Sequence, residues 1–554
     1  MADMDSDPLA HLDDSSTLCA AFQATVAERP HEVALRTPGD VVRLTWAESA
    51  AEVQRLAGGL AGLGVGAGDT VALLLRNRPE FNLVDTAAIH LGAVPWSIYA
   101  TSSAEQIRFV LAGARSRVVV CEREFLGRVK ESLDGTSVEH VVVVDELDTL
   151  PAAPVGFDFA ATWQAVRADW PLTIIWTSGT TGEPKPVELT HYAMCSMLRA
   201  YTTVTGLGRG GRGTSYLPAA HIADRWTAHY WWMMLGFEVT CVADGSKIMR
   251  VLPGIRPTVW GSVPRVFEKL RAALEAQGVT DPAALSAGET AAIREKIGLG
   301  EVRFLIVGAA PLPVETLQYF SDLGLPLSEV WGMSETCGLL TSNPPDDRRF
   351  GTVGPALPGV ELRIAADGEV LARGPQVMRG YRDKPELTAE ALVDGWLHTG
   401  DIGSLDADGY LTIVDRKKEI IINAAGKNMS PVAIENALKT AGTLIGQACV
   451  VGDRRPYNVA LLIVDPEAAS AWAAAHGRAG EAYALTVKDP LLREAVAREV
   501  SVANARLSHV EEVRRWQLMD AEWLPDGDEL TATMKLKRRP IGEKHAATIE
   551  RLYL

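Results

Sequence analysis

A run of hydroxyl-bearing residues, glycines and a lysine occupies residues 177–185, directly after an apolar segment. Glycines let backbone N–H groups approach an anion closely, hydroxyl groups donate hydrogen bonds to it, and an ammonium group neutralises its charge. The run therefore predicts a phosphate-binding loop, although the Walker pattern is absent and a plain surface turn is the alternative. The candidate phosphate contacts are Thr177, Ser178, Gly179, Thr180, Thr181, Gly182 and Lys185.

Two carboxylates further along the chain, which the motif resemblance described below singles out, have side chains that suit a metal ion and a ribose. Glu335 is the candidate magnesium ligand, because Mg²⁺ takes hard carboxylate oxygens and commonly uses one or two protein carboxylates together with phosphates. Asp401 can accept hydrogen bonds from the neighbouring hydroxyl groups of a ribose, as acidic residues do in dinucleotide sites. Taken singly, Glu335 also fits a solvated helix surface, and Asp401 also fits a turn before Gly403.

Such residues need elements to hold them, and the chain alternates β-rich runs with helical patterns. Strands are predicted at residues 70–75, 117–121, 140–144, 171–177 and 302–307, and helices at 45–63, 103–112 and 263–277. This alternation predicts an α/β architecture with mostly parallel sheets. In such sheets ligands bind beyond the carboxyl ends of the strands, which is where these motifs fall.

The character of the chain changes after Gly354. Short strands at residues 360–365, 369–373 and 410–414 predict an antiparallel β-subdomain. A second, smaller unit with mixed helices and strands follows the charged cluster that begins at Asp415. Its helices are predicted at 431–440, 466–475 and 490–505, and its strands at 448–452 and 459–464. We therefore predict an N-terminal domain of residues 1–414 and a C-terminal domain of residues 415–554.

The composition limits the class of protein. With 554 residues, the chain is too long for one hydrophobic core. A net charge of −16 argues against a nucleic-acid coat and against a polybasic membrane anchor. The six cysteines form no C-x-x-C pair, which is typical of reduced thiols in a cytosolic protein. The sequence shows neither a signal-peptide pattern nor an apolar run of membrane-spanning length, so a cytoplasmic protein without an integral membrane segment is predicted.

Several motifs together resemble the adenylate-forming superfamily, which includes acyl-CoA synthetases, luciferases and peptide-synthetase adenylation domains. Residues 176–185 resemble its phosphate loop, and residues 215–225 resemble the segment near the acyl site of long-chain acyl-CoA synthetases. The other matching segments are the adenine-binding turn at 308–312, the aromatic-Gly-x-Thr-Glu motif at 331–336, the ribose motif at 396–401, the hinge at 415–418 and the C-terminal lysine motif at 534–538. Their order along the chain is the order in the family.

The resemblance implies a large N-terminal domain of stacked, mostly parallel sheets with helices and a β-subdomain. It also implies a small, mobile α+β C-terminal domain. The implied activity is an ATP-dependent acyl-CoA ligase that uses Mg²⁺ and coenzyme A. Such an enzyme adenylates a carboxylic acid and then passes the acyl group to the thiol of CoA. A homodimer is compatible with these expectations, and the net charge of −16 predicts no nucleic-acid partner.

The resemblance also assigns roles to individual residues. Lys535 is implied to bridge the substrate carboxylate and the α-phosphate, with Thr180, His221 and Glu335 as the other catalytic candidates. Lys537 is the neighbour with which Lys535 could be confused. The implied ATP and AMP contacts, besides the phosphate loop, are Gly308, Ala309, Ala310, Trp331, Gly332, Met333, Ser334, Asp401 and Arg416.

For the second half-reaction the resemblance implies a rotation of the C-terminal domain about Asp415. A loop that contains Gly426 and Lys427 would then line the path of the pantetheine arm. Gly426 lacks a side chain and would allow this arm to approach the backbone closely. The same segment also reads as an ordinary turn before a helix that begins near Ser430 and Pro431.

An aromatic stretch at residues 226–234 follows the acyl-site motif and looks helical. One interpretation places Trp226, Tyr230 and Trp231 around a large apolar acyl pocket, and the other places them in the core. The first interpretation favours a fatty acid or a bulky polycyclic acid. We find no Phe-Asp motif of the kind that pairs an amino acid's ammonium group, so an amino-acid substrate is less favoured.

Three positions depart from the family's pattern, namely Trp176, Pro186 and Ala425. Pro186 stands where the family usually has glycine, and proline fixes φ and removes an N–H donor. One hypothesis is therefore a ligase that adenylates poorly and mainly transfers acyl groups from a preformed adenylate. A carrier protein in place of CoA is a second alternative. A non-catalytic nucleotide-binding protein on the same fold is a third.

Overall fold

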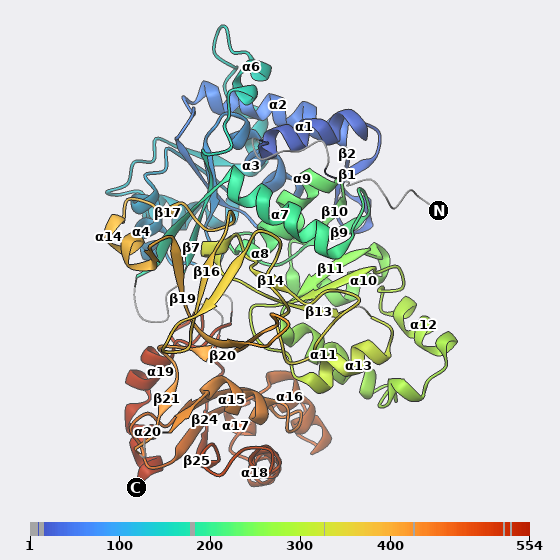
Figure 1. Ribbon diagram of the computed structural model, residues 1–554, viewed down its shortest axis with the longest axis vertical. Coiled ribbons are helices and arrows are strands. Elements are labelled where there is room, and N and C mark those ends of the chain that lie inside the picture. Colours follow the sequence, from blue (N-terminus) through green and yellow to red (C-terminus); the bar gives the residue numbers. More distant parts are fainter. Residues whose placement is uncertain are drawn as a thin grey trace.

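The computed structural model describes residues 9, 16–177, 183–325, 327–424, 427–524, 527–531 and 534–554. A large body holds the first part of the chain, and a smaller body, drawn in orange and red in Figure 1, carries the C-terminus. The predicted α/β class and the two-part organisation are confirmed.

The largest sheet has seven strands in the order β17-β8-β7-β4-β3-β5-β6. Its central strands are parallel and almost wholly apolar, as expected for strands that helices cover on both faces. Their bounds are β3 Thr70–Leu74, β4 Val94–Ser97, β5 Val118–Cys121, β6 His140–Val143 and β7 Pro171–Thr177, with β8 Lys185–Thr190 and β17 Gly380–Tyr381 antiparallel at one edge. The helices packed near this sheet include α1 Leu18–Glu28, α2 Trp46–Gly62, α3 Pro79–His90, α4 Ala104–Ala114 and α7 His191–Thr205.

Two four-stranded sheets follow. One has the order β2-β1-β10-β9, with β1 Val33–Arg36, β2 Arg43–Thr45, β9 Arg212–Ser215 and β10 Glu238–Cys241. The other has the order β11-β12-β13-β14, with β11 Val259–Ser262, β12 Phe304–Val307, β13 Leu327–Trp331 and β14 Thr341–Ser342. The helices that accompany the second sheet are α10 Ile248–Ile255, α11 Pro264–Glu275, α12 Ala287–Lys296 and α13 Val314–Asp322.

The predicted antiparallel β-subdomain is also present. Its strands are β15 Glu361–Ile364, β16 Glu369–Arg373, β18 Leu392–Val393, β19 Trp396–Leu405 and β20 Leu411–Arg416. The pairing of β19 with β20 sets Asp401 opposite Arg416 and Ile402 opposite Asp415. This register places the predicted ribose contact and the predicted hinge side by side.

The C-terminal part contains β21 Ile421–Ile422, β22 Asn428–Met429, β23 Ile445–Val451, β24 Asn458–Val464 and β25 Val513–Leu518, together with α15 Pro431–Lys439, α16 Pro466–Ala475, α18 Pro490–Asn504, α19 Arg538–Lys544 and α20 Ala546–Tyr553. Three of these helices begin with the same device, a polar cap followed by proline. The side chains of Ser430, Asp465 and Asp489 accept hydrogen bonds from the first turns of α15, α16 and α18. Proline suits the first helical position because no N–H is needed there.

Two ion pairs join this part to the large body. The guanidinium of Arg265 on α11 pairs with the Asp465 carboxylate, and the ammonium of Lys269 lies 2.9 Å from Oε1 of Glu467. Asp465 also caps α16 by accepting hydrogen bonds from two backbone N–H groups. The N-terminus of α16 is therefore held against α11.

The aromatic stretch forms two helical pieces where the sequence suggested one. A π-helical turn, η4, covers Arg225–Tyr230, and α9 continues from Trp231 to Leu235. In this turn Arg225 and His229 both bind Asp85 of α3, at 2.8 Å each, and all three side chains are fully buried. These contacts link the π-helical turn to α3 through a buried ion pair.

No helix in the described ranges combines the length and the apolar character that crossing a bilayer requires.

Candidate active site

Asp401 is held at the meeting point of β13 and the β19–β20 pair. The indole N–H of Trp331, at the end of β13, donates to Asp401 Oδ2 at 2.8 Å, and Arg416 Nε lies 2.7 Å from Oδ1. Burial raises the pKa of Asp401, although the positive charge of Arg416 opposes this effect. A carboxylate has acceptor sites for about four hydrogen bonds, so two remain for further donors such as ribose hydroxyl groups.

The backbone at Gly332, which follows Trp331, lies so close to the backbone at Gly338 that no side chain fits at this position. A Cβ atom at Gly332 would lie 2.4 Å from the carbonyl oxygen of Gly338, so only glycine fits. The following residues form a 3-10 turn, η7 Ser334–Thr336, which the Thr336 hydroxyl closes by accepting from the N–H of Met333 at 3.1 Å. This turn leaves Ser334 half-buried and brings Glu335 into the interior.

Glu335 meets the strand that begins at Lys185. The hydroxyl of Tyr381 donates to Glu335 Oε1 at 2.8 Å. The ring of the same tyrosine lies under the ammonium group of Lys185, with 5.0 Å between Nζ and the ring centroid. Two residues that the sequence singled out are thus joined by Tyr381, which it did not single out. No local sequence pattern marks Tyr381, because it is placed by the pairing of β17 with β8, where it lies opposite Val187.

The C-terminal lysine faces the large body. Desolvation lowers the pKa of Lys535, and the charge of Arg416 lowers it further, while the negative charges of Asp401, Glu419 and Glu335 oppose the change. More than a third of the residue's surface is open to solvent, yet enough protein surrounds the ammonium group to weaken its hydration. The structure therefore brings Lys535, Asp401, Arg416 and Glu335 into one electrostatic neighbourhood.

Lys537 is engaged elsewhere. Its ammonium group donates to the carbonyl oxygen of Gly527 at 2.9 Å, within the C-terminal part. The backbone N–H of Lys535 donates to the Thr531 hydroxyl at 3.0 Å, while its ammonium group is influenced by the charges of Asp401 and Glu335. This difference favours Lys535 over Lys537 as the catalytic candidate.

His221 lies near Lys535 and opens the short helix α8 Ile222–Asp224. Its Nδ1 accepts a hydrogen bond from the N–H of Ala223 at 3.1 Å. Burial, together with the positive charge of Lys535, lowers the pKa of His221 to about 4. At neutral pH the ring is therefore uncharged and can accept or donate hydrogen bonds without adding a second cation.

The predicted adenine turn follows β12 directly. A Cβ atom at Gly308 would lie 2.8 Å from the Val330 side chain, so the turn packs on β13 next to Trp331. Ala309 adopts the left-handed region with φ of 70°, and both Ala309 and Ala310 are exposed. The turn is therefore open to a planar base.

Part of the phosphate loop and one residue of the pantetheine loop lie outside the described residues. Thr177 and Lys185 flank the loop as antiparallel partners in β7 and β8. Lys427 is exposed, and its N–H donates to Asn423 Oδ1 at 2.9 Å. The candidates outside the described residues are Ser178, Gly179, Thr180, Thr181, Gly182 and Gly426.

Pro186 is the second residue of β8 and pairs with Trp176 across the sheet. Its carbonyl oxygen accepts from the N–H of Arg382 at 2.9 Å, on the side of β8 that faces away from β7. The nitrogen of a strand residue points to the same side as its carbonyl group, so the missing N–H costs no hydrogen bond to β7. The pairing of β8 with β7 continues on both sides of the ring. Strand β8 therefore accommodates Pro186.

The hinge candidate Asp415 is buried and touches both parts of the chain. It belongs to β20, and its carboxylate accepts from the Ser430 hydroxyl and from the N–H of Val432 at 3.4 Å. Ser430 caps α15. One carboxylate therefore ties the last strand of the β-subdomain to the first helix of the C-terminal part.

The three aromatic acyl-pocket candidates are buried. The Tyr230 hydroxyl accepts from Arg225 at 2.7 Å, and the Trp231 indole N–H donates to the Thr202 hydroxyl at 2.9 Å, which places both in the core. Trp226 alone approaches the nucleotide motifs, since a Cβ atom at Gly338 would lie 2.7 Å from its ring.

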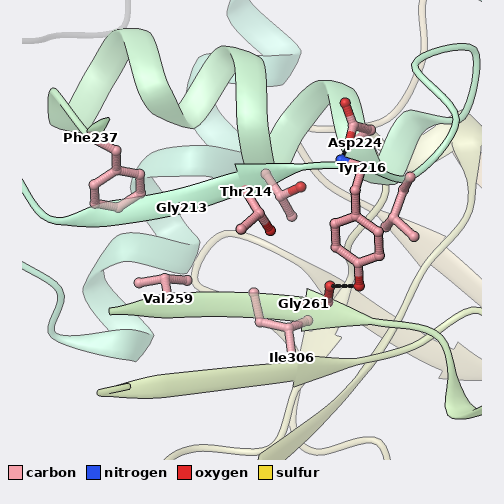
Figure 2. Close-up of a pocket in the computed structure, with 10 residues that line it drawn as sticks. Gly213, Thr214, Tyr216, Asp224, Phe237, Val259, Gly261 and Ile306 are labelled. Atoms are coloured by element: carbon pink, nitrogen blue, oxygen red, sulfur yellow. Dashed lines mark hydrogen bonds between the residues drawn. The ribbon is translucent and has the colours of Figure 1, made fainter. Parts of the chain in front are cut away.

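A narrow cavity of about 20 Å³ lies between β9 and the β11–β12 pair (Figure 2). The Tyr216 hydroxyl crosses it to donate to the carbonyl oxygen of Gly261 at 2.8 Å. The lining residues are Gly213, Thr214, Tyr216, Leu217, Asp224, Thr227, Phe237, Val259, Gly261 and Ile306. The aromatic candidates are not among these ten residues.

Glu329, two residues before Trp331, carries a prediction for stability. Burial raises its pKa from 4.5 to about 8, and its Oε2 lacks a hydrogen-bond partner within the described ranges. An acid with a raised folded pKa binds its proton more tightly when folded. Its contribution to stability is therefore lost as the pH rises from the unfolded toward the folded value. Between pH 6 and pH 8, the unfolding free energy of the wild type should therefore fall by about 2 kcal/mol more than that of Glu329→Gln.

Urea unfolding of both proteins at pH 6 and pH 8 measures this difference. Glu361→Gln, at an exposed surface pair with Arg373, is the control and should leave the pH dependence as it is. Parallel pH profiles for wild type and Glu329→Gln would contradict the assignment of Glu329 as the titrating group.

Comparison with known proteins agrees with this geometry. The model described as AMP-binding enzyme matches residues 22–382, and the model described as AMP-binding enzyme C-terminal domain matches residues 418–554. FadD11 of Mycobacterium tuberculosis, which carries the name of a fatty-acid–CoA ligase, is 47% identical over 74% of this chain and 78% of its own. The long-chain-fatty-acid–CoA ligase FadD15 of the same species is 36% identical over 92% of each chain.

Solved structures show the same fold. O-succinylbenzoate CoA synthetase of Bacillus subtilis in complex with AMP matches with a TM-score of 0.75 and 23% identity, over 95% of this chain and 98% of that chain. The anthranilate CoA ligase AuaEII in complex with anthranoyl-AMP matches with a TM-score of 0.76 and 19% identity, over 98% and 99%. The chain therefore belongs to the AMP-binding enzyme family and is a homologue of the fatty-acid–CoA ligases.

Proposed function

We propose that this protein is an ATP-dependent acyl-CoA ligase that activates a hydrophobic carboxylic acid, with a fatty acid as the favoured substrate. The observation that carries the proposal is the contact of Asp401 with Trp331 and Arg416, in a region whose charges also act on Lys535 of the C-terminal part. The names of the relatives support the acyl-CoA chemistry and the fatty acid.

The first half-reaction joins two anions, the substrate carboxylate and the α-phosphate of ATP. Their repulsion must be screened, and positioned cations do this in nucleotidyl transfer. We propose that Lys535 contacts both anions and that Asp401 accepts hydrogen bonds from the ribose. The neutral ring of His221 would orient the acid without competing with Lys535 for it.

Glu335 is the residue that would hold Mg²⁺. It offers a buried carboxylate oxygen, and no group of three or more His, Cys, Asp or Glu side chains suited to a metal occurs in the part of the chain that the structure describes. One protein carboxylate with phosphate oxygens completing the shell is a common arrangement for Mg²⁺. When bound, the ion would neutralise charge on the phosphates of ATP.

The second half-reaction needs a thiol at the mixed anhydride. We propose that CoA enters after the C-terminal part rotates about Asp415, which brings the loop of Gly426 and Lys427 toward the cleft. In the described pose Lys535 is close enough to Asp401 and Glu335 to be influenced by their charges, and the N–H of Lys427 is bound to Asn423 of its own loop, which fits the first half-reaction. A carrier protein in place of CoA is the alternative acceptor.

A panel of carboxylic acids incubated with ATP, Mg²⁺ and CoA, and analysed by mass spectrometry, tests the proposal. We expect both acyl-adenylate and acyl-CoA, with long-chain fatty acids as the best substrates. Thioester formation with CoA alone would exclude an obligatory carrier protein. Absence of both products with every acid would overturn the proposed function and favour a non-catalytic nucleotide-binding protein.

The position of Pro186 inside β8 supports efficient adenylation over the hypothesis of an impaired first step. Exchange of labelled pyrophosphate into ATP measures that step alone. We expect exchange to be at least as fast as thioester formation. Slow exchange with rapid conversion of synthetic acyl-adenylate would instead favour the impaired enzyme.

A further inference from the structure

Tyr381 stands between a carboxylate and an ammonium group and contacts both. Its hydroxyl donates to Glu335 Oε1 at 2.8 Å, and its ring lies 5.0 Å from the Nζ atom of Lys185. The side chain is buried, and its backbone is fixed because β17 pairs with β8 at Val187. The strand that carries Lys185 therefore also positions the tyrosine.

Within the described residues, Lys185 has no carboxylate partner, and Oε2 of Glu335 has no hydrogen-bond partner. The carboxylate of Glu335 and the ammonium group of Lys185 would attract each other strongly if they met in this poorly hydrated region. Instead, Glu335 accepts one hydrogen bond from the Tyr381 hydroxyl, and Lys185 lies over the face of the Tyr381 ring.

We propose that Tyr381 is a positioning residue that keeps Glu335 and Lys185 apart and available, the first for a divalent cation and the second for a phosphate. The hydroxyl fixes one oxygen of the carboxylate, so that the other is presented to the metal. The ring holds the ammonium group near the phosphate loop without neutralising it. The inference rests on the proposed function, because it assigns these charges to metal-bound ATP.

The direction of the hydrogen bond supports this role. The Tyr381 hydroxyl lies 2.8 Å from Glu335 Oε1, and a carboxylate can only accept at this position, so the phenol is the donor. A protonated phenol donates to the carboxylate and leaves it ionised, as a metal ligand must be. Partners of this kind orient metal ligands, and their loss typically costs 10–100-fold in metal affinity.

Two substitutions separate the two contacts. Tyr381→Phe keeps the ring and removes the hydroxyl, while Tyr381→Leu removes both. Mn²⁺ binding is measured by electron paramagnetic resonance in the presence of an ATP analogue with a methylene group between the α- and β-phosphates. We expect Tyr381→Phe to weaken Mn²⁺ binding about 10-fold, with the metal-free affinity for the analogue unchanged. Tyr381→Leu should weaken both.

Tyr410→Phe is the matched control. Its hydroxyl donates to Asp347 Oδ2 at 2.8 Å, away from Glu335, and its loss should leave Mn²⁺ binding as in wild type. Conversion of synthetic acyl-adenylate to thioester needs neither Mg²⁺ nor the pyrophosphate-binding charges, so it should proceed at the wild-type rate in Tyr381→Phe.

Wild-type Mn²⁺ affinity in Tyr381→Phe would overturn the inference. So would an equal loss in Mn²⁺ binding, thioester formation and melting temperature, which would mean that Tyr381 only supports the fold. These outcomes are distinct from failure of the proposed function, in which the wild-type protein itself would bind no Mn²⁺ with the analogue and form no adenylate.

Discussion

Replacing Lys535 with alanine is expected to lower the rate of acyl-adenylate formation by about 10²–10³-fold, because one positioned charge at the reacting phosphate is lost. Thioester formation from synthetic acyl-adenylate should continue near the wild-type rate, since the proposed second pose moves Lys535 away from the cleft. Pyrophosphate exchange and thioester formation from the synthetic adenylate, measured in parallel, separate the two effects.

Lys537→Ala is the control for this experiment. Its ammonium group is bound to the Gly527 carbonyl oxygen, so its removal should change adenylation only slightly. If Lys537→Ala abolished exchange while Lys535→Ala did not, the two lysines would have been assigned in the wrong order. Equal loss of both half-reactions in Lys535→Ala would argue against a role confined to the first.

The second large effect concerns the buried group around Asp85. Burial raises the pKa of this carboxyl, but the charge of Arg225 and the contact with His229 outweigh it and lower the pKa, so Asp85 is ionised. Asp85→Asn leaves the Arg225 charge without its counter-charge in a fully buried place. We expect a loss of about 3–5 kcal/mol in unfolding free energy, which is typical of breaking a buried ion pair by removing one partner.

Urea unfolding followed by tryptophan fluorescence measures this loss, because Trp232 stacks on His229 in the same region with ring centroids 5.9 Å apart. The exposed pair of Arg373 and Glu361 supplies the control, and Glu361→Gln should leave the midpoint almost unchanged. An equally small shift in Asp85→Asn would show that the buried charge is relieved by water or by rearrangement.

The sequence predicted the α/β class, and the strands and helices that it predicted lie within a few residues of the matching elements. Continuous apolar runs such as the one in β5 have few alternatives to a buried strand, and the Ser-Pro and Asp-Pro pairs mark the helix starts of the C-terminal part. Comparison with known proteins confirmed the family. The roles of Asp401, Glu335 and Lys535 remain predictions, which their common neighbourhood supports.

The remaining features could not be read from the sequence because they depend on pairing between distant segments. Tyr381 gains its contacts from the register of β17 on β8, and no local pattern marks it. The buried ion pair in the π-helical turn joins Arg225 to Asp85, which lies 140 residues earlier. Periodicity also could not distinguish a pocket wall from a core, and it is side-chain packing that places Tyr230 and Trp231 in the core.

The ion pairs between α11 and α16 should make the rate of domain rotation depend on ionic strength. An enzyme that alternates between two poses must separate Arg265 from Asp465 and Lys269 from Glu467 in every cycle. Dissolved ions weaken such attractions, with a screening length of about 8 Å at physiological ionic strength. If the proposed rotation occurs, ionic strength should therefore change how long the C-terminal part stays in the described pose, and with it the balance between the two proposed half-reactions.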